Sequence, residues 1–159
     1  MTRLQSDPEF IRKNEVHEAK KRAIESQLGV EEKTLVADLA KSGFQVTSVW
    51  DLVNTNSSYT AAIPVLMRHL GLSYHPKIHE GIARALTVRE ARGVAGRTIL
   101  DELKRANDKS HEVRWALANA LTEAADSEIK DEIKTLVTDV CYGDVREILK
   151  QALNGLAVR

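Results

Sequence analysis

Hydrophobic residues recur in one helical pattern in three segments of the chain, residues 76–87, 111–122 and 143–154. Four apolar positions coincide when the segments are aligned: Ile78, Val113 and Val145; Ile82, Leu117 and Leu149; Ala85, Ala120 and Ala152; Leu86, Leu121 and Leu153. The spacing within each segment predicts an amphipathic helix. The segments lie 35 and 32 residues apart, and a helical repeat of about this length is typical of α-solenoids.

A second amphipathic segment precedes each of these three, at residues 59–72, 89–106 and 128–142. Its apolar residues follow the i, i+3, i+4, i+7 spacing of a helix: Ile63, Leu66, Met67 and Leu70; Ile99, Leu100 and Leu103; Ile133, Leu136, Val137 and Val140. The pattern therefore predicts three helical hairpins. Residues 31–42, followed by Gly43 and a short helix near Val49, predict a weaker fourth copy.

The N-terminal region predicts one further helix. Asp7 and Pro8 are suited to its first positions, and Gly29 is suited to closing it after Leu28. Its charged face, with Lys13, Lys20, Lys21 and Arg22, is either a solvated surface or a partner-binding arm. We expect a capping helix over residues 1–28 and a repeat domain over 29–159, together one compact domain.

The apolar fraction of 43% is enough for a core, and composition favours packed helices because only 4% of the residues are aromatic while Ala and Leu are plentiful. The single cysteine, Cys141, excludes an internal disulfide, and its apolar neighbours predict a buried, unreactive thiol. The sequence has no signal-peptide pattern and no run of about 18 apolar residues. These features predict a cytoplasmic protein that does not enter membranes.

Two segments resemble the second helix of a HEAT repeat, which begins with an acidic residue followed by Val-Arg. They are residues 112–114 and 144–146, whereas residues 77–79 depart from the pattern. The resemblance covers about residues 31–156, and Pro64 also fits it. It implies an α-α superhelix, a short right-handed solenoid of helical hairpins that presents its second helices on a concave side.

Two other stretches, residues 43–54 and 81–91, resemble small stand-alone bacterial HEAT-like proteins. HEAT repeats mainly hold another macromolecule, so the resemblance implies a binding role. Because one fold serves many functions, it identifies no partner.

The outer side of the second helices holds the candidate binding residues. If Val113, Ala116, Leu117, Ala120 and Leu121 face inward, then residues 114, 115, 118, 119 and 122 point away. Tryptophan is favoured as an anchor at protein interfaces. The predicted partner-binding residues are Trp115, Arg84, Asn119, Glu80, Gln151 and Lys150. The alternative is that Trp115 covers the neighbouring repeat or packs on Arg114, and that this strip is only the solvated side of the helices.

Two arginines, Arg114 and Arg146, are expected to bridge neighbouring repeats instead of binding a partner.

The charge distribution disfavours a dedicated nucleic-acid binder, because the formal net charge is zero. Residues 59–100 carry six basic and two acidic side chains, so a local anion-binding site remains an alternative. A DNA glycosylase of HEAT-like fold is an alternative, given Trp50, Asp51 and Trp115, but the chain has few aromatic residues to stack a base.

No catalytic motif, such as a glycine-rich phosphate loop, HExxH or CxxC, occurs in the sequence. His75 and His79 have the spacing of zinc ligands on a helix, but no third ligand accompanies them, and we expect no metal or cofactor. The sequence predicts a non-enzymatic module that binds a partner protein, such as an immunity or inhibitor protein. A nucleic-acid-binding protein and a structural or oligomerising module are the alternatives.

Overall fold

A computed structural model describes residues 7–158, in which helices are joined by loops and turns and no strand is present. The α-helices are α1 (Pro8–Glu31), α2 (Lys33–Lys41), α3 (Trp50–Val53), α4 (Ile63–Leu70), α5 (Pro76–Ala85), α6 (Gly96–Arg105), α7 (His111–Ala124), α8 (Lys130–Thr138) and α9 (Arg146–Val158). The all-α prediction is confirmed. Among the described residues, no helix combines the length and the apolar character needed to cross a membrane.

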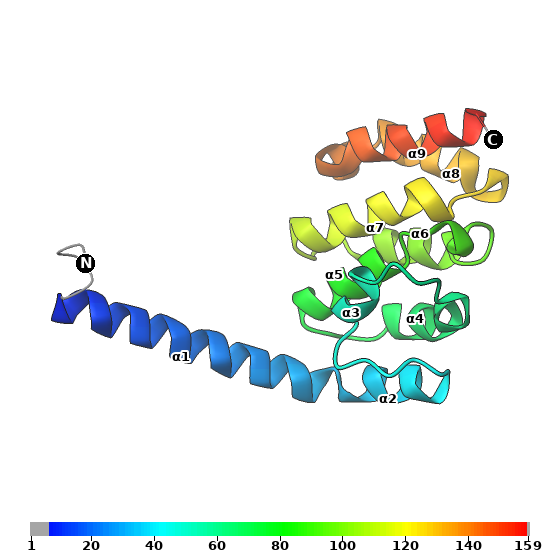
Figure 1. Cartoon of the computed structure of the whole chain (residues 1–159). Coiled ribbons are helices and arrows are strands. Elements are labelled where there is room, and N and C mark those ends of the chain that lie inside the picture. The colour runs from blue at the N-terminus through cyan, green and yellow to red at the C-terminus, as the bar shows by residue number, and fades with distance from the viewer. Residues whose placement is uncertain (1–6, 159) are drawn as a thin grey trace.

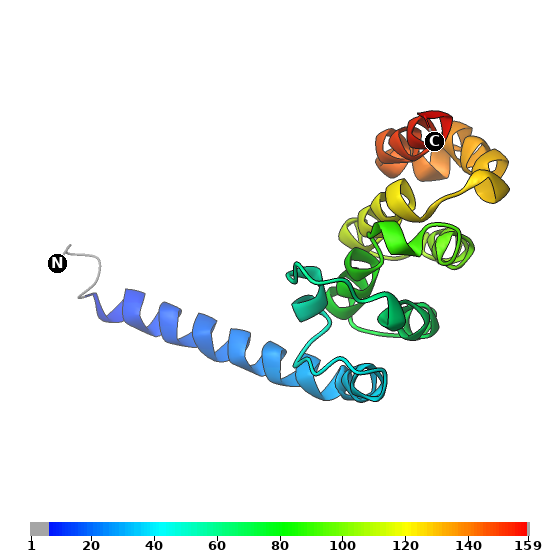
Figure 2. The same ribbon diagram turned by 45° about the vertical axis from the view of Figure 1, so that its right-hand side comes forward.

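The helices after α1 pack in two layers (Figures 1 and 2). One layer contains α3, α5, α7 and α9, in which each helix contacts the next. The other contains α2, α4, α6 and α8, and α4, α6 and α8 pack against α5, α7 and α9 respectively. We call the outer side of the α3–α5–α7–α9 layer the second-helix face.

The aligned apolar positions form the core between these layers. Ile82, Leu117 and Leu149, which share one repeat position, are each completely buried. Val113 and Ile78, which share another, are 0% and 1% exposed. The inward stripe predicted from periodicity is therefore correct for the second helices.

Three glycines were relevant to the predicted helix ends, and the structure agrees with only part of those predictions. Gly43, with φ of 96°, follows α2 as predicted, because a glycine accepts this left-handed backbone without steric cost. Gly93, with φ of 73°, interrupts the helix expected over residues 89–106, so α6 begins only at Gly96. Gly29 does not close the first helix, which continues through it to Glu31.

The segment between α8 and α9 also differs from the prediction. The helix expected over residues 128–142 ends at Thr138, and a 3-10 segment, Val140–Val145, follows. This tighter turn carries Val140 into solvent, where it is 86% exposed, and leaves Cys141 exposed. The prediction of a buried thiol was therefore wrong.

The first helix, α1, projects away from the layers, on the side where the second helices lie (Figure 2). None of its residues is buried. Its C-terminal end is fixed to the stack by two neighbouring carboxylates. The backbone N–H of His75 donates to Glu31, and Glu32, at the turn before α2, accepts from the N–H of Val49 at 2.6 Å and the hydroxyl of Ser48 at 3.0 Å.

Candidate functional site

A chain of five side chains crosses the second-helix face from α3 through α5 to α7. Lys77 lies over the Trp50 ring, with Nζ 4.8 Å from the ring centroid, and Nζ is 3.9 Å from Oε2 of Glu80. Nε of Arg84 donates to Oε1 of Glu80 at 2.9 Å. The Arg84 guanidinium carbon lies 5.7 Å from the Trp115 ring centroid. We call this set, Trp50, Lys77, Glu80, Arg84 and Trp115, the aromatic–cation chain.

Helical spacing explains the middle of this chain. Lys77, Glu80 and Arg84 are separated by three and four residues on α5, so they occupy one side of the helix. Trp50 reaches them because α3 packs closely on α5 at Gly81, where an added Cβ would lie 2.7 Å from a Val49 methyl carbon. A close helix crossing thus brings a distant tryptophan onto α5.

Glu80 was predicted to be an exposed contact residue, and this was wrong, because it is only 8% exposed. It lies between two cations, and its carboxylate is used within the protein. Its role is to position Arg84, whose side chain is 36% exposed. The two terminal nitrogens of Arg84 make no hydrogen bond to residues 7–158, so they can donate to a ligand.

Trp115 is half-buried and packs against the core. The guanidinium of Arg84 lies over one side of the ring. Because Arg84 belongs to the preceding hairpin, Trp115 does cover part of the neighbouring repeat, as the alternative expected. A half-buried aromatic ring beneath a guanidinium is held in place, and a rigid anchor loses little side-chain entropy when a partner binds. The structure therefore brings Trp115, Arg84 and Glu80 together.

The expectation that residues 114 and 118 point away from the core was wrong. Arg114 is 5% and Ala118 0% exposed, because α7 is enclosed by α5, α6 and α9. The predicted bridging role of Arg114 is confirmed by its bidentate hydrogen bonds to Asp144, both 3.0 Å long, and by its donation to the carbonyl of Cys141 at 2.9 Å. This pairing lowers the pKa of Asp144 below its ordinary value and raises that of Arg114.

The other predicted contact residues surround this group without joining it. Asn119 is half-buried one turn after Trp115, and its side chain makes no hydrogen bond to the described residues. Lys150 and Gln151 are exposed on α9, where Nζ of Lys150 lies 3.3 Å from Glu147. Among residues 7–158, neither makes an ion pair or ring contact with Arg84 or Trp115.

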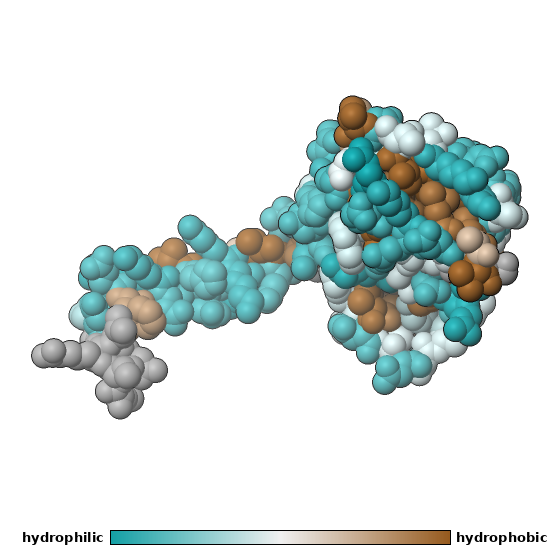
Figure 3. All heavy atoms as spheres, turned by 90° about the horizontal axis from the view of Figure 1, so that it is seen from above, coloured by the Kyte–Doolittle hydropathy of each residue, from teal (hydrophilic) through white to brown (hydrophobic). Residues whose placement is uncertain are grey.

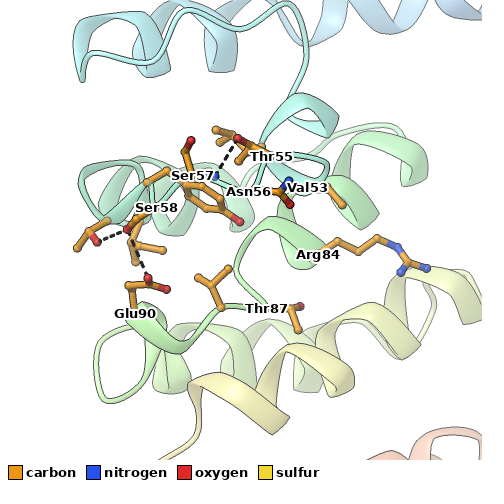
Figure 4. Close-up of a pocket in the computed structure, with 13 residues that line it drawn as sticks. Val53, Thr55, Asn56, Ser57, Ser58, Arg84, Thr87 and Glu90 are labelled. Carbon is orange, nitrogen blue, oxygen red and sulfur yellow. Dashed lines mark hydrogen bonds between the residues drawn. The ribbon is translucent and has the colours of Figure 1, made fainter.

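A polar pocket of about 320 Å³ lies beside Arg84 (Figure 4). Its hydroxyl and amide groups come from the loop after α3 and from Thr87, and Glu90 adds a carboxylate. The Ser58 hydroxyl donates to Glu90 at 3.3 Å, and the Arg84 side chain extends away from this pair in Figure 4. The pocket can supply hydrogen bonds at the edge of the second-helix face.

Three arginines of the basic middle region, Arg84, Arg92 and Arg97, are paired with carboxylates. Nη1 of Arg97 lies 2.7 Å from Glu132, whose pKa is lowered by hydrogen bonds from Lys104 and Arg97. Nη2 of Arg92 lies 3.7 Å from Glu123. These pairs reduce the positive charge available to a phosphate backbone.

Asp51, the residue weighed as a glycosylase catalyst, has a local structural role. Its carboxylate accepts from the backbone N–H and hydroxyl of Thr47, at 2.9 and 3.0 Å, and from the N–H of Ser48 at 3.3 Å. These hydrogen bonds lower its pKa, which weakens it as a proton acceptor. They hold the turn that begins α3.

The two histidines considered as metal ligands occupy different environments. His75 precedes α5, and its Nδ1 accepts from the N–H of Lys77 at 3.0 Å. His79 is 2% exposed, and its Nε2 has no hydrogen-bond partner among residues 7–158 although it lies 3.4 Å from Glu102. No group of three or more His, Cys, Asp or Glu side chains within residues 7–158 is placed to hold a metal ion.

The sequence did not identify Trp50 and Lys77 as members of the site. The charge alternation of Lys77, Glu80 and Arg84 at helical spacing was the available signal for Lys77. Trp50 belongs to the aromatic–cation chain only because α3 packs on α5, and no local sequence pattern predicts that packing.

Comparison of the chain with protein-family models, curated proteins and solved structures gave no match. The resemblance to HEAT repeats therefore stays a prediction from the sequence.

Proposed function

We propose that this protein is a non-enzymatic module that binds a partner protein on its second-helix face. In this proposal the two layers form a short right-handed solenoid of HEAT-like hairpins, and the second-helix face is its concave side. The partner contacts Trp115 and accepts hydrogen bonds from Arg84, while Asn119, Gln151 and Lys150 contribute polar contacts around them.

The aromatic–cation chain is the observation that supports this proposal. Tryptophan and arginine are enriched among residues that dominate the energy of protein interfaces. Here Glu80 holds Arg84 against Trp115, so both side chains are ordered before a partner arrives. The free terminal nitrogens of Arg84 suit a carboxylate or carbonyl group of the partner.

An inhibitor or immunity protein is the narrower form of this proposal. Its site consists of binding groups that are ordered before a partner arrives, which suits tight docking on an enzyme surface. A partner enzyme would be blocked when its surface docks on the second-helix face. An activity assay of the purified partner with increasing amounts of this protein tests the narrower form, and unchanged activity at saturation contradicts it.

Affinity capture from nuclease-treated lysate tests the proposal itself. The baits are the wild type, Arg84→Ala with Trp115→Ala, and the control Lys134→Ala, which alters an exposed residue of α8 in the other layer. We expect at least one protein to be retained by the wild type and the control but lost from the double variant. Equal retention by all three baits would contradict the proposal. A partner that the wild type retains only from lysate without nuclease treatment would also contradict it.

A further inference from the structure

The junction between α1 and α5 forms a second surface, a groove of about 600 Å³. Its lining residues are His17, Lys20, Lys21, Ile24, Glu25, Leu28, His75 and Lys77. Ile24 and Leu28 are the apolar residues of this lining, which we call its apolar floor, and Lys20, Lys21 and Lys77 are its lysines. We call this surface the junction groove.

Helical spacing places the α1 part of this groove on one side of the helix. His17, Lys21, Ile24 and Leu28 are separated by four, three and four residues, which keeps them on one face. Ile24 is 51% exposed, and apolar side chains appear at intervals along the side of α1 seen in Figure 3. This face of α1 has no covering element among the described residues.

The groove is held open by the way α1 is attached. Glu31 binds the backbone of His75 at the start of α5, and Glu32, only 4% exposed, binds the backbone of Val49 ahead of α3. These two contacts, on adjacent residues, fix the end of α1 relative to both helices. A fixed groove binds a partner with less loss of conformational entropy than a mobile arm does.

The junction groove is continuous with the second-helix face. Lys77 belongs to both, because it lines the groove and lies over the Trp50 ring. A second hollow of about 310 Å³ shares Leu28 and Lys77 with the groove and is also lined by Trp50. In Figure 2, α1 leaves the stack on the side of the second helices, so one partner can contact both surfaces.

The charges in the groove identify the chemistry of its ligand. Lys20 and Lys21 make no ion pair with the described residues. Nζ of Lys77 lies 3.9 Å from Oε2 of Glu80, a carboxylate that also pairs with Arg84. Glu25 is the single carboxylate among the lining residues. Two unpaired ammonium groups beside an apolar floor complement a segment that carries carboxylates next to apolar side chains.

We propose that the junction groove binds an acidic amphipathic segment of the partner protein. Its apolar side chains pack on Ile24 and Leu28, and its carboxylates pair with Lys20, Lys21 and Lys77. This inference rests on the proposed function, because the same partner occupies the second-helix face. It adds the class of segment and the part of α1 that recognises it.

An anionic lipid surface would also suit basic and apolar side chains, but the geometry favours a peptide. The groove lies in the inner corner where α1 meets α5, and Lys77 and His75 on the stack form one of its walls. A flat membrane cannot enter such a corner, whereas a single peptide segment can.

Selection from a phage-displayed random peptide library on the full-length protein tests this inference. We expect enriched peptides that combine Asp or Glu with apolar residues at helical spacing. Their affinity, measured by fluorescence anisotropy, should fall at least about tenfold in Lys20→Glu with Lys21→Glu, and also as salt is raised. The matched control is Arg12→Glu with Arg22→Glu, which makes the same charge change on α1 outside the groove and should alter affinity less than about twofold.

Three results would overturn the inference: no enrichment, enrichment of basic peptides, or equal loss of affinity in both charge variants. Binding of phosphatidylserine vesicles that only Lys20→Glu with Lys21→Glu abolishes would assign the groove to a lipid surface and also overturn it. Failure here is distinguishable from failure of the proposed function. In that case Arg84→Ala with Trp115→Ala would still lose the captured partner, while both charge variants would keep it.

Discussion

The helices α1 and α7 reach the same secondary structure by different means. α7 has 14 residues, and eight of them are buried against α5, α6 and α9. α1 has 24 residues and buries none. Tertiary packing supplies most of the helical stability in α7, whereas α1 depends on local interactions and on its attachment at Glu31 and Glu32.

Local interactions in α1 are visible at its first turn. Asp7 caps the helix by accepting from the N–H of Glu9 at 2.9 Å, and Pro8 occupies the first helical position. Nζ of Lys13 lies 3.4 Å from Glu9 in an exposed pair of the kind that contributes only about 0.3–0.5 kcal/mol. Because α1 buries none of its 24 residues in the stack, its surface is available for a partner to cover.

The comparison is tested most strongly by truncating one apolar side chain in each helix. Leu117→Ala should lower the free energy of unfolding by about 2–5 kcal/mol, because Leu117 is completely buried. Ile24→Ala should change it by less than about 0.5 kcal/mol, because the side chain is 51% exposed. Urea unfolding measures both, and a loss below about 1 kcal/mol for Leu117→Ala would show that α7 is not the packed centre.

Replacing one arginine in α7 and one in α1 should give the next largest difference in the free energy of unfolding. Arg114→Met removes the guanidinium donor from Asp144 and from the backbone carbonyls of Ala106 and Cys141, although the Ala106 carbonyl still accepts from the N–H of Lys109. We expect a loss of about 2–3 kcal/mol, less than for a fully buried pair because Asp144 is 36% exposed. Arg12→Met, at an exposed site on α1, should cost less than about 0.5 kcal/mol. Equal losses in thermal unfolding would contradict the bridging role of Arg114.

Much of the fold could be predicted from the repeat pattern, because buried positions in a helix follow its period. Ile82, Leu117 and Leu149 are examples. The helical period predicts only one buried stripe on each helix, however. A helix that is packed on several sides buries residues outside that stripe. Arg114 and Ala118 are buried for that reason, and their environment depends on α9, which is distant in sequence.

The candidate site was less predictable than the fold. The sequence identified Arg84 and Trp115, but it placed Glu80 in solvent, where the structure buries it between cations. The contribution of Trp50 depends on close packing at Gly81, a tertiary fact that no local spacing contains.

Replacing the N-cap residues of α7 and α1 should produce smaller changes in stability. Ser110→Ala removes the acceptor for the N–H of Val113 in α7 and should lower global stability by about 1 kcal/mol. Asp7→Ala removes the equivalent acceptor in α1 and should increase amide hydrogen exchange within α1, with no change in global stability. A global loss from Asp7→Ala would mean that α1 and the stack unfold as one unit.

The smallest effect expected is on pH dependence. Burial lowers the pKa of His79, so the unfolded chain binds more protons than the folded chain between the lowered value and the ordinary value of 6.5. Stability should therefore fall on acidification from about pH 7.5 to 6.0, by at most ~0.8 kcal/mol for one such group. His79→Gln should remove that part of the dependence, and His17→Gln, on the exposed α1, should not. Urea midpoints that show no difference between the two variants would contradict a neutral, buried His79.

The affinity of Trp115→Ala for the captured partner tests the central claim most directly, provided that urea unfolding is measured on the same variant. We expect binding to weaken at least about thirtyfold, equivalent to ~2 kcal/mol. The half-buried position of Trp115 should limit the loss of unfolding free energy to less than about 2 kcal/mol, so the variant stays folded. A folded variant that binds the partner as tightly as the wild type would contradict the assignment of the second-helix face as the binding surface.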